Sequence, residues 1–206
     1  METAKFASHL WSGLRLLVIA GLLSTGQVNA ATSQGDTTVV FTPDVGYCGQ
    51  LYGDSCDEGS GWQSSSGEVG TDYYYDPSGP YMFISRGILA FNTTVLDTDM
   101  VVDSVYLDFW TTSVSSPEDM LYFMAPDSGF LYPPSWGPDY YSLFDSTCAP
   151  EGTTGLSEDS GPYRQVLKPN VVNPGGYTII GMRMREDLFQ CGQAEGSHYV
   201  YLNLSS

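Results

Sequence analysis

Aromatic side chains gather in those stretches of the chain that are rich in Gly, Pro, Ser and Asp. An aromatic ring can stack on the apolar face of a sugar ring while nearby amides and carboxylates bind the sugar hydroxyls. Tyrosine and tryptophan are also enriched in contacts between subunits, so the pattern leaves both uses open. The candidates for sugar binding are Trp62, Tyr132, Trp136 and Tyr140.

Carboxylates form small clusters at several expected turns, and calcium prefers such hard oxygen ligands. Asp97, Asp99 and Asp103 are the best candidates for a calcium site, although their spacing is not that of an EF-hand. Solvated turns of an acidic protein are the plainer interpretation. Two carboxylates roughly 5 to 10 Å apart could also cleave glycosidic bonds, which leaves a polysaccharide-active enzyme as a third hypothesis.

The chain has no recognisable catalytic motif. His198 is the one histidine after residue 30, and no Gly-x-Ser-x-Gly elbow is present. No Gly-rich loop follows an expected strand and opens a helix, so the motif for nucleotide binding is missing too. We therefore expect no enzyme activity, no catalytic residue and no cofactor other than the candidate calcium.

The four cysteines are Cys48, Cys56, Cys148 and Cys191. In an exported protein an even number of cysteines indicates disulfides, and four cysteines allow three connectivities. We favour Cys48 with Cys56 and Cys148 with Cys191. A zinc site is the alternative, but no Cys-x-x-Cys pair is present.

Two N-glycosylation sequons begin at Asn92 and Asn203. They predict a glycoprotein if the host glycosylates its exported proteins, and modification would place both side chains in solvent.

Residues 1–30 have the pattern of a signal peptide: basic residues, an apolar run at 16–23, and Val28-Asn29-Ala30 as a cleavage signal. The apolar run is much shorter than the roughly 20 residues that span a bilayer. We expect secretion to the cell surface or beyond, with residues 31–206 forming a single β-sandwich domain.

Acidic residues dominate the composition. Removing residues 1–30 takes away Lys5, Arg15 and Glu2 and changes the formal net charge from −17 to −18. Such a chain repels phosphate backbones, so we expect neither nucleic acid nor a membrane as a partner. Copies of the chain also repel one another, and self-association needs strong directional contacts.

The fold class follows from short alternating segments rich in Val, Ile, Tyr, Phe and Thr between Gly- and Pro-rich turns. In one segment, Val105, Leu107 and Phe109 share a face opposite Tyr106 and Trp110. These patterns predict an all-β, antiparallel sandwich of jelly-roll type. Stretches 46–80 and 125–161 carry little strand signal and are expected to be long, disulfide-pinned loops. The predicted strands are 37–42, 81–91, 101–112, 120–125, 163–167, 177–185 and 199–204.

Several of these segments share a pattern with a known family. Arg86, Leu89 and Phe91 form an Arg-x-x-Leu-x-Phe strand, and a later strand carries Ser104, Val105, Leu107 and Phe109. Together with stretches 38–47 and 177–187, they resemble the exported jelly-roll modules called DNRLRE domains, which are related to a group of carbohydrate-binding modules. The resemblance implies a secreted jelly roll. The cysteines and aromatic loops depart from the usual module.

The function hypothesis that we rank first is a non-catalytic subunit of an extracellular filament or surface layer. Val39, Val40 and Phe41 would form an assembly strand that completes the sheet of a neighbouring copy, head to tail. Pairing of this strand within its own sheet stays open as the simpler interpretation. The alternative function is a carbohydrate-binding module that uses the loop aromatics.

Overall fold

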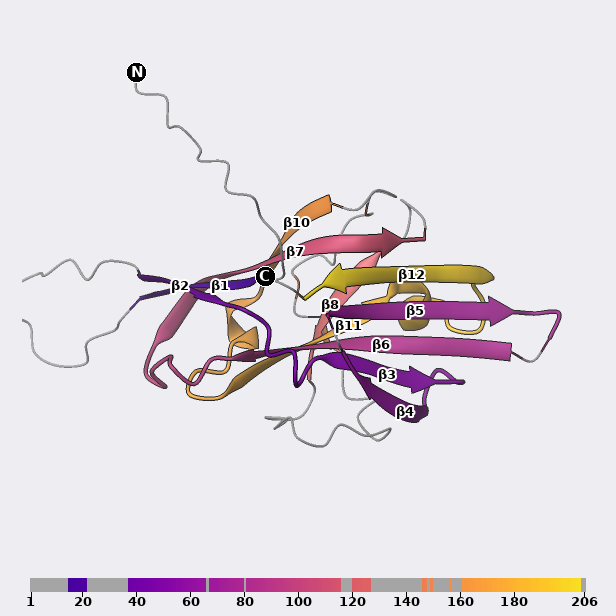
Figure 1. Ribbon diagram of the computed structural model, residues 1–206, viewed down its shortest axis with the longest axis horizontal. Helices are drawn as coiled ribbons and strands as arrows, with labels where there is room; N and C mark the ends of the chain where they lie inside the picture. Colours follow the sequence, from indigo (N-terminus) through magenta and orange to yellow (C-terminus); the bar gives the residue numbers. More distant parts are fainter. Residues whose placement is uncertain are drawn as a thin grey trace, which may run out of the picture.

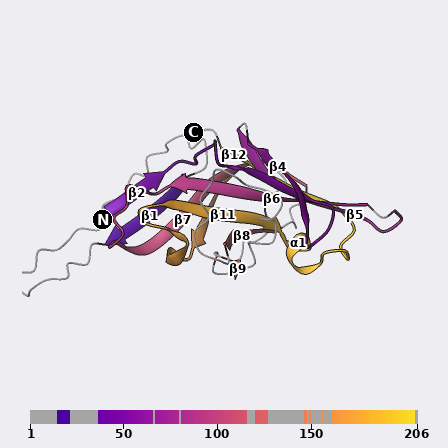
Figure 2. The ribbon, with the colours of Figure 1, turned by 90° about the horizontal axis from the view of Figure 1, so that it is seen from below.

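The computed structural model describes residues 15–21, 37–65, 67–79, 81–115, 120–126, 146–147, 149, 156 and 161–204. In this part of the chain the regular structure is almost entirely β-strand, and the strand pairs are antiparallel. Figures 1 and 2 show the strands in two layers, and the buried hydrophobic residues form one core cluster. The predicted all-β sandwich is confirmed.

The first layer is built around the N-terminal half of β6 (Tyr81–Asn92). That half pairs with β5 (Glu68–Asp76) at one edge and with β3 (Gly49–Gly53) at the other. Beyond β3 the layer continues with β4 (Gly59–Ser64), and beyond β5 it continues with β12 (Gly196–Asn203) to the end of β7 (Val101–Val114). Figure 1 shows β12, β5, β6 and β3 side by side. In spatial order the strands are β4, β3, β6, β5, β12 and β7.

The second layer starts from the C-terminal half of β6, which pairs with β11 (Tyr177–Met184). β11 pairs in turn with β8 (Leu121–Ala125), and β8 with β9 (Ser146–Thr147). In Figure 2 these strands lie below β6. Phe109 of β7 meets Phe123 of β8 with ring centroids 5.4 Å apart, so the two layers pack directly against each other.

The burial pattern of β7 follows from the period of two in a strand. Val105, Leu107 and Phe109 are buried, whereas Tyr106 and Trp110 are half-buried, as the alternation predicts. β11 differs, because both of its faces are covered and even Arg183 is only 7% exposed.

Short elements complete the fold. β10 (Gly161–Leu167) pairs with one edge of β7, and β1 (Arg15–Gly21) pairs with the other, next to β12. β2 (Thr37–Phe41) pairs with β1. A single-turn helix α1 (Arg185–Phe189) follows β11, and a 3-10 turn η2 (Pro169–Val171) precedes it.

All seven predicted strands are present, with ends shifted by a few residues. The predicted loop at 46–80 is wrong, because it contains β3, β4 and β5. These strands are rich in Gly, Ser, Asp and Tyr, and their pairing with β6 and β12 supplies the order that their own sequence does not indicate. Most of the predicted loop at 125–161 lies outside the described residues.

Candidate functional site: the outer face of the first layer

The first layer has one face on the core and one face toward solvent. Leu51, Tyr73, Ile84 and Val200 point inward and are fully buried. Their sequence neighbours point outward across five strands, because successive side chains of a strand alternate between faces. We call this surface the outer face; its residues are Gln50, Tyr52, Gln63, Asp72, Tyr74, Tyr81, Phe83, Ser85, Tyr199 and Tyr201.

The register of the strands brings polar groups together at the middle of the outer face. Ser85 lies opposite both Asp72 of β5 and Tyr52 of β3. The Ser85 hydroxyl donates to Asp72 Oδ2 at 2.7 Å, and the Gln50 amide donates to the Ser85 hydroxyl at 3.2 Å. The Asp72 carboxylate is thus held from the side of β6 and β3.

Two tyrosine hydroxyls extend this cluster to either side. Tyr201 OH of β12 lies 2.9 Å from both carboxylate oxygens of Asp72. Tyr52 OH donates to Gln63 Oε1 at 2.9 Å and lies 3.2 Å from Gln50 Oε1. The result is a row of amide, carboxylate and hydroxyl groups that crosses the sheet from β4 to β12.

Burial shapes the electrostatics of this row. It raises the pKa of Asp72, although hydrogen bonds from Ser85 and Tyr201 oppose the shift. Burial and the nearby carboxylate also raise the pKa values of Tyr52 and Tyr201. Both phenols therefore stay protonated at neutral pH and keep a proton to donate.

Aromatic rings flank the polar row. Tyr52 and Phe83 have ring centroids 5.6 Å apart, and Tyr74 and Tyr81 are 5.7 Å apart. Tyr81 is 61% exposed. Rings of this kind offer wide apolar surface beside polar anchors, a combination found in ligand sites.

Tyr199 and Tyr201 form a third pair of rings on β12, with centroids 6.0 Å apart. Gly70 lets the ring of Tyr201 lie close to the sheet, since a Cβ at Gly70 would sit 2.5 Å from that ring. A side chain at position 70 would lift Tyr201 away from Asp72.

Of the four sugar-binding candidates from the sequence, the structure describes Trp62, which does not lie on this face. Trp62 lies opposite buried Leu51 on the inner side, and its ring covers Gly49, where a Cβ would be 2.5 Å from it. Tyr132, Trp136 and Tyr140 lie outside the described residues. The alternation of Asp72 with Tyr74 and of Tyr199 with Tyr201 was the available signal for the outer face, but only the strand register brings those residues together.

The three acidic candidates do not form a metal-binding group in the described part of the chain. Asp97, Asp99 and Asp103 are exposed, and the described residues include no group of three metal-ligating side chains that could hold an ion. His198 is half-buried, and its Nε2 lies 3.3 Å from the Glu195 carbonyl oxygen.

The two sequon asparagines lie at strand ends. Asn92 is exposed at the end of β6, and its Oδ1 accepts a hydrogen bond from the Thr94 hydroxyl at 2.6 Å. Asn203 is half-buried at the end of β12. Glycosylation of either residue stays a prediction.

Both predicted disulfides, Cys48 with Cys56 and Cys148 with Cys191, are wrong. The structure joins Cys56 to Cys191 and leaves Cys48 as a buried thiol. Cys48 lies under β6, where its sulfur contacts the Ala90 backbone and burial raises its pKa to about 12. Cys56 and Cys48 are close in sequence, but the β3–β4 loop carries Cys56 to the turn after α1, where Cys191 lies. Cys148 lies outside the described residues.

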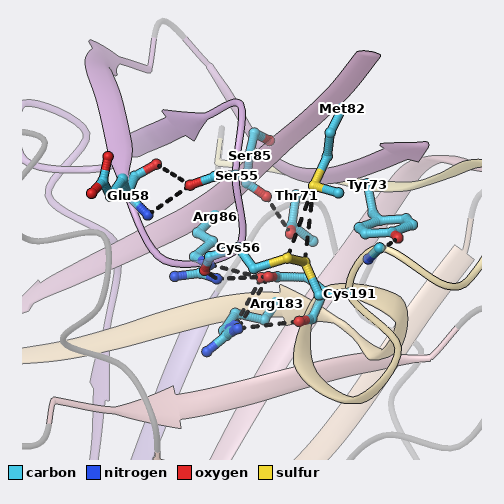
Figure 3. A network of polar contacts seen from close by, with 12 residues as sticks. Ser55, Cys56, Glu58, Thr71, Tyr73, Met82, Ser85, Arg86, Arg183 and Cys191 are labelled. Carbon is cyan, nitrogen blue, oxygen red and sulfur yellow. Dashed lines mark hydrogen bonds and ion pairs between the residues drawn. A yellow bond between two sulfur atoms is a disulfide. The ribbon is translucent and has the colours of Figure 1, made fainter. Parts of the chain in front are cut away.

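A buried ion network beside this disulfide joins β6, β11, α1 and the β3–β4 loop (Figure 3). Arg86 of β6 donates to both carboxylate oxygens of Asp187 in α1, at 2.7 and 2.6 Å, and to the Cys56 carbonyl at 2.8 Å. Arg183 of β11 donates to the same carboxylate at 2.8 and 3.0 Å. Burial opposes ionisation of Asp187, but the two arginines together lower its pKa. The network anchors the β3–β4 loop, and with it one side of the outer face.

Comparisons with protein-family models, curated proteins and solved structures find no match to this chain. The resemblance to DNRLRE modules therefore stays a prediction. Among the described residues, no helix has the length and apolar character needed to cross a membrane.

Proposed function

We propose that this chain is an exported, non-catalytic protein that binds neutral polysaccharide on its outer face. The observation that carries the proposal is the row of Gln50, Asp72, Tyr52 and Tyr201 groups between pairs of aromatic rings. Amides and hydroxyls suit sugar hydroxyls, and half-buried rings suit the apolar sugar face. The strongly negative net charge of −17 disfavours anionic polysaccharides.

Affinity electrophoresis of the full chain in gels containing polysaccharide tests this function. We expect a β-1,4-glucan or a β-1,4-xylan to retard the protein and anionic polygalacturonate not to. Replacing Tyr52 and Phe83 together with Ala removes one ring pair and should weaken retardation at least about tenfold, which corresponds to about 1.4 kcal/mol.

The matched control is a second ring pair away from the outer face. Tyr122 of β8 and Phe189 of α1 have centroids 5.4 Å apart, and Phe189 is 63% exposed. Their joint replacement with Ala should leave retardation unchanged. Equal loss in both double variants would contradict the outer-face assignment.

We propose as a second function that the chain is a structural subunit of an extracellular filament or surface layer. The supporting observation is that β2, the predicted assembly strand, pairs among the described residues only with β1, which lies within the predicted signal peptide. Electron microscopy of the processed protein tests this function. Regular filaments would support it, and a monodisperse monomer at all concentrations would contradict it.

A further inference from the structure

The strand β1 belongs to the segment that the sequence predicts to be removed on export. Its seven residues lie between two other strands, with β7 on one side and β2 on the other. On β7 they cover positions from Val101 to Asp108. Cleavage after Ala30 would therefore open a strand-wide gap in the sheet.

The edge of β7 that would be uncovered belongs partly to the core. Positions 16 and 18 of β1 lie opposite Leu107 and Val105, and both of these β7 side chains are fully buried. Residues 101–104 of β7 pair, within the described chain, with β1 alone. An uncovered edge with unpaired backbone groups is a template for another strand.

The chain's own β2 is in the wrong direction to take the place of β1. β2 is antiparallel to β1, and β1 is antiparallel to β7, so β2 runs parallel to β7. Its end is fixed to β6 by a bridge from Pro43 to Phe91 and by a hydrogen bond of 2.8 Å from Asp44 N to the Ala90 carbonyl. The β2 strand of the same copy therefore cannot replace β1 in antiparallel pairing, whereas the β2 strand of a second copy can.

A second copy of this chain offers a matching strand. In β2, Phe41 is 7% exposed and Val39 is half-buried, while Val40 between them is 52% exposed. Phe41 and Val39 thus have the same two-residue spacing as positions 16 and 18 of β1, which lie opposite Leu107 and Val105 of β7. Loss of β1 would also remove the ladder partner of β2, which frees that strand to leave its own molecule.

We propose that the predicted leader strand β1 blocks a strand-acceptor site on β7, and that its removal lets residues 37–41 of a second copy pair there, antiparallel, to form a head-to-tail polymer. This inference rests on the second function above and is independent of polysaccharide binding. The contact is heterologous, since donor and acceptor are different surfaces, and such contacts build open chains where the rotation between copies does not close a ring.

The test uses the full chain with a site for a sequence-specific protease inserted after Ala30. Analytical ultracentrifugation follows the protein before and after cutting. We expect a single copy before the cut and species of increasing mass after it. An added peptide of residues 15–21 should stop this growth at about one peptide per chain, because it refills the acceptor site.

Two variants one residue apart separate the inward from the outward side of the donor strand. Val39→Asp should abolish growth after the cut, and Val40→Asp should leave it intact, with circular dichroism confirming that both variants fold. Growth of the uncut chain, or equal growth in both variants, would overturn this inference while leaving the filament function standing. No growth in either form, at any concentration, would overturn the inference and the filament function together.

Discussion

Asp187 is the buried carboxylate that neutralises the charges of two buried arginines. Its carboxylate is fully buried and accepts hydrogen bonds from Arg86 and Arg183. Asp187→Ala leaves two positive charges buried without their partner, and we expect the free energy of unfolding to fall by about 3–5 kcal/mol. Urea denaturation measures this change. Asp97→Ala, at an exposed turn residue, is the control and should have little effect.

The pH dependence of that loss follows from the direction of the pKa shift. The pKa of Asp187 is lower in the folded protein than in the unfolded chain. Its contribution to stability is therefore present above the unfolded value of about 3.9 and disappears as the pH falls through the lower, folded value. The difference between wild type and Asp187→Ala should shrink in that acidic range. A stability difference between wild type and Asp187→Ala that stays constant as the pH falls below the unfolded pKa would contradict this account.

Among the elements, the β3–β4 hairpin is held by a disulfide to a cysteine near the C-terminal end of the chain. The disulfide from Cys56 to Cys191 closes a loop of 135 residues, and a loop of this size constrains the unfolded chain strongly. We expect its reduction to lower the free energy of unfolding by about 2–5 kcal/mol. Denaturation with and without reductant measures the change.

Single cysteine variants separate this pairing from the one favoured by the sequence. Cys56→Ala and Cys191→Ala should each abolish the effect of reductant on stability, whereas Cys48→Ala should retain it. Peptide mapping under non-reducing conditions should recover Cys56 joined to Cys191. Recovery of Cys48 joined to Cys56 would show that the structure has the wrong partner.

Some strands can be predicted from the sequence and others cannot. β7 is predictable because apolar and polar residues alternate along its middle, and β11 is predictable because Ile and Met residues make up much of it. β3, β4 and β5 are not, because Gly, Ser, Asp and Tyr dominate them and tertiary pairing decides their conformation. The sequence does not indicate the outer face for this reason, since Gln50 of β3, Asp72 of β5 and Tyr201 of β12 meet only through the register of these strands with one another and with β6.

For the molecule as a whole, net charge sets the conditions under which copies can meet. Cleavage of the predicted leader would remove Lys5, Arg15 and Glu2, and the remaining chain would carry a formal charge of −18. At about 0.01 M salt the Debye length is about 30 Å, and copies repel one another over that distance. At about 0.15 M salt the Debye length is about 8 Å, and the repulsion is much weaker. Strand pairing through the β7 edge acts only at contact, so the long-range repulsion controls the approach.

Salt should therefore accelerate the polymerisation of the processed chain without altering its retention by neutral polysaccharide. Light scattering after protease cutting, at about 0.01 and about 0.15 M NaCl, measures the first effect, and we expect growth to be several-fold faster at the higher salt because screening shortens the repulsion. Affinity electrophoresis at the same two salt concentrations measures the second. Faster growth at low salt would mean that attraction between charges joins the copies, and the strand-exchange contact would then not be the one that forms the polymer.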